Sequence, residues 1–416
     1  MPGALEQLRW IDEQAEAMAE LLTSWAQIGS GSNDVPGLER MIEALTDHFD
    51  PLADELRHVE LPPRPVVDDA GQVVHRPLGK ALWLRRRVDA ARRVLLNIHM
   101  DTVAAAGEAG EVTRVEADRL RGRGVADAKG GIVILLTALT ALEQSPAAGN
   151  IGYEVLINPD EELGSPGSTP LLADCARRCD LGLVFEPSLE DGAMVSQRKG
   201  SGNFTLVVRG RGAHAGREPG AGRNAVTALS RIVTELDAIG DWLAGTQVNV
   251  ARIVGGGASN VVPALAVCRF NIRYAEPGHE RRLRRRLARL LDDAEQRDDV
   301  RTELHGGFTA PPKLLDAPMA TLMEHVTAVG RELALPPIAW RSTGGVCDGN
   351  RLAAAGLTNL DTLGPRGGGL HSEGEYVLLP SLTERAKLAA GLLVKLAAGE
   401  LAWPGRAATD QQRGVG

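Results

Sequence analysis

The chain is poor in cysteine and in aromatic residues, and it has no excess of positive charge. The chain has 416 residues, of which 4 are cysteines. Aromatic residues make up 3% of the chain. The cysteine spacing matches neither a zinc ribbon nor a disulfide framework. A formal net charge of −8 gives no general attraction to nucleic acid or to an anionic membrane. The composition therefore excludes a small disulfide-stabilised domain and disfavours a nucleic-acid-binding protein.

Long hydrophobic runs are also scarce. We predict that no segment reaches the roughly 18 apolar residues of a membrane span. The first residues, MPGALEQLRWIDEQ, show no basic segment followed by an apolar one. We therefore expect a cytoplasmic protein in a reducing compartment, with no membrane partner. Glycine, in contrast, is abundant at 48 residues, and many glycines lie beside acidic residues and histidines.

Two patterns of predicted secondary structure divide the chain. Apolar strands that end in polar residues alternate with helices, which is typical of an α/β sheet with its functional groups at the carboxyl ends of strands; these strands are expected at 94–98, 153–157 and 181–185. Further along, the order strand, helix, strand, strand, helix, strand is the signature of a split βαβ, ferredoxin-like α+β domain. We predict a mixed sheet flanked by helices in residues 1–194 and 306–416, and an inserted domain at 195–305.

Histidine and acidic residues follow the first predicted strand. His99 and Asp101 stand at its end. A neutral imidazole is a good zinc ligand, and a nearby carboxylate can fix its tautomer. Asp127 lies in a glycine-rich loop, and its two oxygens suit a bridge between two cations. Taken singly, His99 has the alternative of a satisfied core group, and Asp127 that of a cap on the following helix.

The segment Asp160-Glu161-Glu162-x-Gly164-Ser165 is the strongest indication of chemistry. Adjacent acids at a strand end repel each other unless a cation lies between them. One carboxylate can hold a metal ion while its neighbour moves protons, and hydrolysis of an amide by metal-activated water needs both functions. An exposed acidic loop is the alternative.

Two more loops supply candidate ligands. Glu186 precedes Pro187, and a residue before proline is held extended, which directs its side chain; a carboxylate at the rim of a site is the alternative. His371 follows a run of three glycines, which lets the backbone approach a crowded site closely. Mixed nitrogen and oxygen ligands suit Zn²⁺, with Co²⁺ or Mn²⁺ as other choices.

Taken in order from about residue 94 to 390, these motifs resemble those of the M20 metallopeptidases, which include glutamate carboxypeptidase, acetylornithine deacetylase, succinyl-diaminopimelate desuccinylase and aminoacylase. The resemblance implies that Asp101 supports His99, that Glu161 is the general base, and that the bond between Asp127 and Ala128 is cis. It also implies two Zn²⁺ per subunit and assigns their ligands: His99 and Glu186 to one ion, Glu162 and His371 to the other, and Asp127 to both.

The predicted insert resembles the family's dimerisation domain, so the resemblance implies a homodimer. His214 lies in Gly212-Ala213-His214-Ala215-Gly216, a motif whose histidine reaches the partner subunit's active site and steadies the oxyanion. Without the resemblance, a histidine in a hairpin is the alternative. Arg273 is implied to hold a substrate carboxylate, which suits its planar guanidinium. Asn260 and Gly345 lie in loops that are implied to face the substrate.

The chain departs from glutamate carboxypeptidase at two positions where that enzyme carries a cation for the glutamate side chain. Met194 stands in place of a lysine, and Phe308 lies where that enzyme has Gly-Arg-Pro. The candidate replacements are Arg198, Lys199 and Arg366. We therefore expect recognition of one carboxylate through Arg273 without a defined preference for glutamate.

The leading hypothesis is a cytoplasmic, homodimeric, zinc-dependent hydrolase that cleaves an amide or peptide bond next to a carboxylate. Its substrate would be a small molecule, as in a carboxypeptidase or an N-acyl-amino-acid deacylase. One alternative is an N-carbamoyl-amino-acid amidohydrolase. Another is a non-catalytic binding protein on the same scaffold, which would lack a ligand or the base, whereas this chain retains all of them. The basic helix expected at 279–297 has no interleaved aromatic residues, so no nucleic-acid partner is expected.

Overall fold

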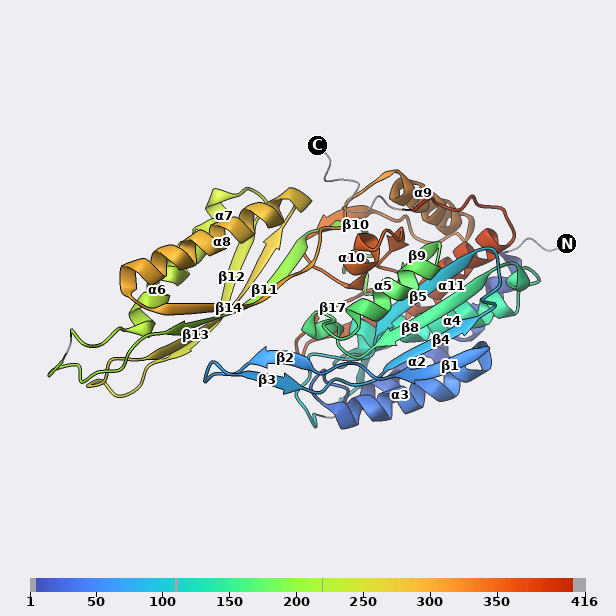
Figure 1. Cartoon of the computed structure of the whole chain (residues 1–416). Helices are drawn as coiled ribbons and strands as arrows, with labels where there is room; N and C mark the ends of the chain where they lie inside the picture. Colours follow the sequence, from blue (N-terminus) through green and yellow to red (C-terminus); the bar gives the residue numbers. More distant parts are fainter. Residues whose placement is uncertain (1–4, 109–110, 219, 407–416) are drawn as a thin grey trace.

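The computed structural model describes residues 5–108, 111–218 and 220–406. Two lobes lie side by side (Figure 1). The smaller lobe runs from Gly200 to Ala310 and contains a four-stranded sheet. The rest of the described chain forms the larger lobe around a six-stranded sheet. The fold class is the predicted one, a mixed α/β protein with a second α+β unit, while the predicted boundaries at 195 and 305 stay predictions.

The sheet of the larger lobe is mixed. Its four neighbouring parallel strands are mostly apolar and almost wholly buried, as expected for strands covered by helices on either side. The pairing of β4 with β8 and with β1 is antiparallel. The strand order is β1 (Glu55–Val59), β4 (Ala81–Arg86), β8 (Gly152–Asn158), β5 (Arg93–His99), β9 (Leu181–Val184) and β16 (Asn359–Leu360).

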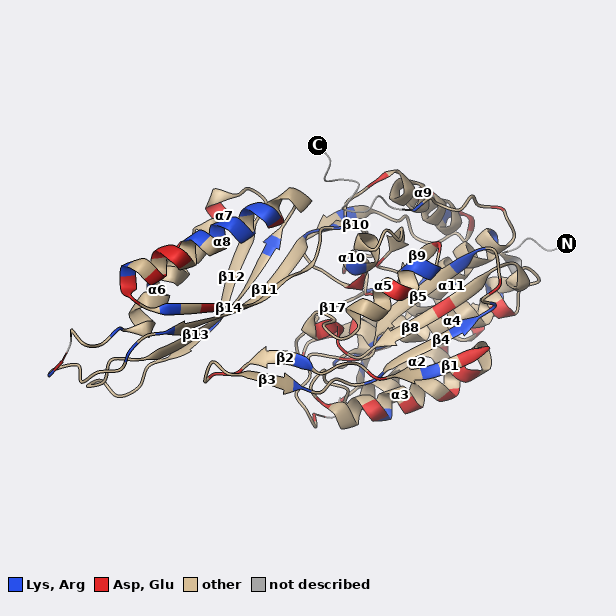
Figure 2. Cartoon of the chain, in the orientation of Figure 1, with Lys and Arg blue, Asp and Glu red and all other residues tan. Residues whose placement is uncertain are grey.

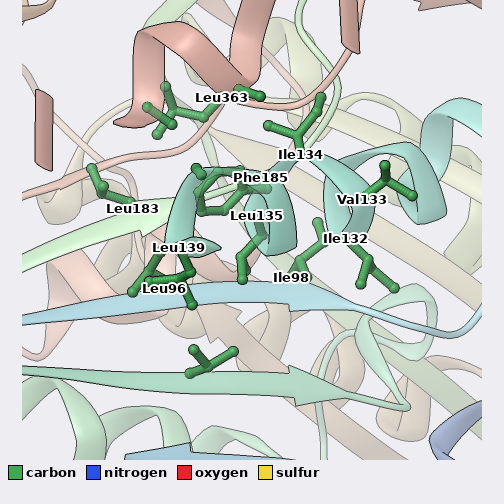
Figure 3. Close-up of a cluster of buried hydrophobic side chains, with 14 of the residues drawn as sticks. Leu96, Ile98, Ile132, Val133, Ile134, Leu135, Leu139, Leu183, Phe185 and Leu363 are labelled. Atoms are coloured by element: carbon green, nitrogen blue, oxygen red, sulfur yellow. The ribbon is translucent and has the colours of Figure 1, made fainter. Parts of the chain in front are cut away.

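Helices cover both faces of this sheet. The first face carries α2 (Ala15–Gln27), α3 (Val35–Phe49), α4 (Gly131–Glu143) and α11 (Pro380–Ala397), and the second carries α5 (Thr169–Arg178) and α10 (Asp348–Ala354). Figure 3 shows Leu135 and Leu139 of α4 lying over Leu96 and Ile98 of β5. Full burial of each such side chain is worth about 1.5–3 kcal/mol relative to exposure. This core anchors the strand ends that carry the site.

One segment corrects the prediction about apolar runs. Residues Val125–Glu143 are long and apolar enough to cross a membrane by length and composition, with a mean hydropathy of 1.7. The prediction that no segment reaches this length was therefore wrong. The segment is 89% buried inside the protein, because it includes α4, which packs between β5 and α11. The run is explained by a core helix.

The smaller lobe has the predicted order of strands and helices. Two helices, α6 (Ala225–Asp237) and α8 (Pro277–Asp298), pack on one face of its antiparallel sheet. The short helix α7 (Ile239–Trp242) leads into the sheet, whose order is β12 (Gln247–Gly255), β13 (Leu265–Tyr274), β11 (Gly200–Arg209) and β14 (Arg301–Ala310). Figure 2 shows both signs of charge along α8. Arg284 and Arg297 of this helix pair with Glu280 and Glu235, which partly neutralise its basic face.

Two structures connect the lobes. The strand β10 (Met194–Arg198) leads into β11 and pairs with β15 (Trp340–Thr343) of the larger lobe. The hairpin of β2 (Arg64–Val67) and β3 (Val73–Arg76) reaches from the larger lobe to the smaller one (Figure 1). Its buried Val67 packs against Val207 and Val267, on the sheet face that the helices leave free. This free face also looks toward the cavity described below.

A further helix and a small sheet belong to the larger lobe. The helix α9 (Ala317–Glu332) packs against α11. A four-stranded sheet beside the central one holds the loop of His371, in the order β17 (Gly367–Gly368), β18 (Tyr376–Leu378), β7 (Arg119–Arg121) and β6 (Thr113–Glu116). Through this small sheet, residues from the C-terminal part of the chain lie against the loop of Asp127.

Candidate active site

The predicted ligands converge at one edge of the central sheet. His99 is the last residue of β5, Glu161 and Glu162 follow β8, and Glu186 follows β9. The carboxyl ends of neighbouring parallel strands meet at one sheet edge, so residues far apart in sequence come together there. Asp127 arrives from the loop before α4.

The ligand atoms form two groups. Those of His99, Glu161 and Glu186 lie within 4.8 Å of one another, and so do those of Asp127, Glu162 and His371. Asp127 connects the groups, because its Oδ1 lies 3.1 Å from His99 Nε2 and its Oδ2 lies 3.2 Å from His371 Nε2. Asp127 thus lies between the two groups, where a carboxylate that bridges two cations would lie.

The donor arrangement suits cations. His99 Nδ1 lies 2.9 Å from the main-chain oxygen of Asp101, and donation to that oxygen leaves the lone pair of Nε2 facing Asp127 and Glu186. Acceptors that face each other in the interior need a proton or a cation between them. Oε1 of Glu162 is buried and lies 3.3 Å from His371 Nε2, yet no described donor makes a well-directed hydrogen bond to it. These residues therefore fit a pair of metal ions.

The electrostatics of the cluster point the same way. Burial raises the pKa of the carboxyl groups of Glu162 and Glu186, and raises that of Glu161 well above its ordinary value. Burial also acts to raise the pKa of Asp127, but its contacts with the imidazoles of His371 and His99 hold it below its ordinary value. Contacts with Asp127 and Glu162 raise the pKa of His371 to about 10. Shifts of this kind show that the cluster is stabilised by positive charge, which bound cations would supply.

Asp101 organises both halves of the cluster. Its Oδ1 accepts a hydrogen bond from the backbone N–H of Glu161, and its Oδ2 accepts one from that of Glu162, each at 3.1 Å. Ser32 donates to the same carboxylate at 2.7 Å. His99 Nδ1 lies 3.3 Å from Asp101 Oδ1. Fully buried Asp101 therefore orients the imidazole through its main-chain oxygen, and its carboxylate holds the turn that carries both glutamates.

The loop of Asp127 is held by a buried acid that sequence analysis did not single out. Glu375 accepts hydrogen bonds from the backbone N–H groups of Gly124, Ala126 and Asp127 at 2.9–3.0 Å. The available signal was its place four residues after His371, in the same short loop. The peptide bond between Asp127 and Ala128 is cis, as the family resemblance implied.

His371 reaches the cluster through an unusual backbone. Gly369 has a φ of +65°, and a Cβ there would lie 2.5 Å from the oxygen of Gly374. His371 itself has a φ of 63°, which is uncommon for a residue other than glycine. The glycine run thus lets this loop fold back tightly and presents the imidazole to Asp127 and Glu162.

A second network supports the tandem glutamates from behind. Asp348 accepts hydrogen bonds from Ser165 Oγ and, at 2.8 Å, from Asn158 Nδ2. Arg351 donates to the main-chain oxygen of Gly164 and lies 3.2 Å from Asp348. Asp348 lies three residues after Gly345, whose loop was implied to face the substrate. In the structure it is buried beneath the turn of Glu161.

A cavity of about 480 Å³ opens over the cluster, between the lobes. Arg273 and Gly345, two of the predicted substrate-binding residues, line it. His214 and Asn260 lie outside its lining, exposed in neighbouring loops of the smaller lobe, where Ala215 N–H donates to the oxygen of Asn260. Nδ1 of His214 accepts hydrogen bonds from the N–H groups of two following residues. The structure of one chain thus brings Arg273 to the cavity and leaves His214 away from it.

Met194 and Phe308 stand where glutamate carboxypeptidase carries basic side chains, and both lie outside the cavity lining. Met194 is buried in the hydrophobic core, and its neighbour Val195 lines the cavity instead. Phe308 packs against Phe204 and Tyr274. Of the three candidate replacements, Arg198 lines the cavity, held at 2.9 Å by Asp361. Lys199 and Arg366 lie outside the lining and contact Gln247 and Glu384.

Comparisons with known proteins identify the family of the chain. The family model for peptidase family M20/M25/M40 matches residues 95–395. The chain is 31% identical over 322 residues to carboxypeptidase G2 of Pseudomonas sp. (strain RS-16), covering 74% of this chain and 75% of that protein. It is also 31% identical over 300 residues to succinyl-diaminopimelate desuccinylase of Pseudomonas syringae pv. syringae (strain B728a), covering 68% of this chain and 75% of that protein.

Solved structures share the fold at lower identity. Human carnosine dipeptidase 1 aligns with a TM-score of 0.72 and 17% identity, over 95% of this chain and 100% of that one. The dipeptidase Dug1p of Saccharomyces cerevisiae aligns with a TM-score of 0.73 and 16% identity, over 95% of this chain and 99% of that one. With the strand-end cluster and the sequence relatives, these matches lead to one conclusion: the chain belongs to peptidase family M20/M25/M40 and is a metal-dependent hydrolase.

Proposed function

We propose that this chain is a dinuclear zinc hydrolase that cleaves an amide or peptide bond next to a carboxylate, as a carboxypeptidase or an N-acyl-amino-acid deacylase. The observation that carries the proposal is the pair of ligand groups that share Asp127, with Glu161 beside them and Arg273 across the cavity. The relatives named as a carboxypeptidase and a desuccinylase support this range of substrates.

The proposed ligands are those assigned from the sequence. His99 and Glu186 would hold one ion, Glu162 and His371 the other, and Asp127 both. When bound, the two zinc ions would polarise the substrate carbonyl and lower the pKa of a water molecule. Nitrogen and oxygen donors of this kind favour Zn²⁺, while Co²⁺ or Mn²⁺ would also be accepted.

Glu161 is the proposed general base. It takes a proton from the attacking water and delivers it to the leaving amine. Its carboxylate lies as close to His99 and Glu186 as a ligand would. We assign proton transfer to it because its neighbour Glu162 already faces His371, and because Asp101 holds the backbone of both residues in place. In this place Glu161 would lie close to both the attacking water and the leaving amine, so one carboxylate could carry the proton between them.

Arg273 is the proposed anchor for the substrate carboxylate. It reaches the cavity from β13, on the opposite side from the ligand cluster. A carboxylate held there would place the neighbouring amide toward Glu161. Gly345 lines the same cavity and would contact the substrate through its backbone.

A homodimer is part of the proposal. His214 has an exposed side chain and lies away from its own chain's cavity, in a loop beside that of Asn260. Because Nδ1 accepts backbone hydrogen bonds, Nε2 carries the proton and is free to donate to an oxyanion in the partner subunit.

A cytoplasmic setting is also proposed, supported by four buried cysteines that form no disulfide with one another.

A substrate screen tests the proposal. The zinc-loaded full chain is incubated with N-acyl amino acids, dipeptides and N-carbamoyl amino acids, and release of free amine is measured. We expect cleavage of members of the first two groups that carry a free carboxylate, and no cleavage after chelation. Cleavage confined to N-carbamoyl compounds, with release of ammonia and CO₂, would contradict the proposal in favour of the amidohydrolase alternative.

A further inference from the structure

The free face of the smaller sheet carries a row of polar side chains over the cavity. In the pairing of β11 with β13, Ser201 lies opposite Arg273 and Asn203 opposite Asn271. Alternate residues of a strand point to opposite faces, so these four share one face. Ser201, Asn203 and Arg273 line the cavity. Asn271 lies among them.

Asn271 links this row through both ends of its amide. Its Nδ2 faces three acceptors: the main-chain oxygen of Gly202 at 3.0 Å, Ser201 Oγ at 2.9 Å and Asn203 Oδ1 at 2.7 Å. Its Oδ1 accepts a hydrogen bond from Arg273 Nε at 2.9 Å. The reverse orientation of the amide would turn an oxygen toward the main-chain oxygen of Gly202 and an N–H toward the guanidinium of Arg273. The hydrogen bonds therefore fix which way Asn271 points.

Arg273 has unused donors. Its Nη1 is buried and has no hydrogen-bond partner among the described residues. Burial lowers the pKa of this guanidinium, and the nearby Glu161 acts to raise it. A buried donor without a partner is costly, and a carboxylate can accept parallel N–H bonds from a guanidinium. With Nε held by Asn271, the terminal nitrogens remain for an anion in the cavity.

We propose that Asn271 is a positioning residue for carboxylate recognition. It holds Nε of Arg273, so the long side chain keeps its terminal nitrogens toward the cavity before substrate binds. Such preorganisation lowers the entropic cost of binding. The proposal rests on the proposed function, because it requires that Arg273 binds the substrate carboxylate.

The kinetic test compares an acid with its neutral analogue. The substrate is the N-acyl amino acid cleaved best in the screen, and the analogue is the same compound with its carboxylate converted to the primary amide. In Asn271→Ala we expect KM for the acid to rise about tenfold, as for loss of one hydrogen bond to a charged group. We expect kcat to change less than about twofold, and the KM or inhibition constant of the amide to stay the same.

Two companion variants separate the possible failures. Adding Asn271→Ala to Arg273→Ala should raise KM no further than Arg273→Ala alone, because one interaction has already been lost. If Arg273→Ala leaves KM for the acid unchanged, the proposed function loses its substrate anchor. If Arg273→Ala raises KM and Asn271→Ala does not, the positioning role alone is wrong.

A matched control comes from the neighbouring strand. Asn249 of β12 lies beside Asn271 in the pairing of β12 with β13, and its side chain is exposed. Asn249→Ala should keep the KM of the acid within about twofold of the wild type, because its side chain makes no hydrogen bond to Arg273 among those described. An equal rise of KM in both variants would contradict a specific role for Asn271.

A spectroscopic readout does not depend on turnover. In protein labelled with ¹⁵N-arginine, the Nε–H signal of Arg273 is identified by its absence from Arg273→Lys. We expect its exchange with solvent to be at least about tenfold faster in Asn271→Ala and in the milder Asn271→Ser, and unchanged in Asn249→Ala. Equal exchange rates in the wild type and in a folded Asn271 variant would overturn the proposal.

Discussion

The two walls of the cavity differ in how firmly their functional side chains are held. On the larger lobe, Asp101 accepts hydrogen bonds from three residues, and Glu375 accepts three from the loop of Asp127. On the smaller lobe, the guanidinium of Arg273 makes one described hydrogen bond, to Asn271. The ligand cluster is therefore prepared within one lobe, while substrate recognition depends on how the other lobe is placed over it.

The hairpin of β2 and β3 is one of the two structures that connect the walls. Its Asp69 pairs with Arg252 and Arg269 of the smaller lobe, and Arg209 donates to the oxygen of Gly71 at 2.6 Å. These contacts lie on the same sheet face as Arg273 and Asn203. A contact far from the chemistry thus helps to set the distance between the recognition wall and the ligand cluster.

The largest expected effect lies on the firmly held wall. Glu161→Ala should lower kcat by about 10²–10⁴-fold, the range for loss of a general base. Metal content, measured by atomic absorption, should stay near that of the wild type, because the proposed ligands remain. Turnover close to that of the wild type would remove Glu161 from the proposed mechanism.

A smaller effect is expected from the residue that organises the cluster. Asp101→Ala removes the acceptor for the backbone of Glu161 and Glu162 and the partner of Ser32. Loss of such a supporting group typically costs about 10–100-fold in metal affinity or activity. Competition with a chelator measures the affinity. An unchanged metal affinity together with an unchanged kcat would show that the turn of Glu161 and Glu162 keeps its conformation without Asp101.

On the recognition wall, the effect should appear in KM. Arg273→Ala should raise KM for substrates with a free carboxylate by about tenfold or more, because a charge-assisted contact is lost. The value for neutral analogues should not change. If KM rises equally for the acid and the amide, Arg273 does not recognise the carboxylate.

The smallest effect is expected at the contact between the walls. Asp69→Ala breaks two partly exposed ion pairs, and such pairs contribute about 0–1 kcal/mol to stability. We expect thermal unfolding to shift little, while KM for the acid rises about twofold and kcat is kept. A shift in stability of several kcal/mol would mean that the hairpin is part of the folding core.

Much of the larger lobe could be predicted from local patterns in the sequence. The strands expected at 94–98 and 153–157 are Arg93–His99 and Gly152–Asn158. The candidate site residues were also predictable, because His99, Glu161 and Glu186 stand at or shortly after the ends of apolar strands. Strand ends and glycine-rich loops are local features, which a single sequence displays.

The support of the site could not be predicted in this way. Glu375 contacts the loop of Asp127 across a separation of 248 residues, and Asp348 contacts Ser165 across 183. No local pattern distinguishes a buried acid that accepts backbone hydrogen bonds from an exposed one. Met194 shows the same limit, because it was compared with a substrate-binding lysine and is a core residue.

The sequence by itself therefore determined which residues are candidates for holding metal and moving protons, and in which strand–loop units they lie. The tertiary structure decided which side chains share a cavity. In β10, Val195 and Arg198 face the cavity while Met194 faces the core, because neighbouring residues of a strand point to opposite faces and an irregularity between Val195 and Gln197 shifts the register. That choice depends on how distant strands pair, and pairing is a property of the folded chain.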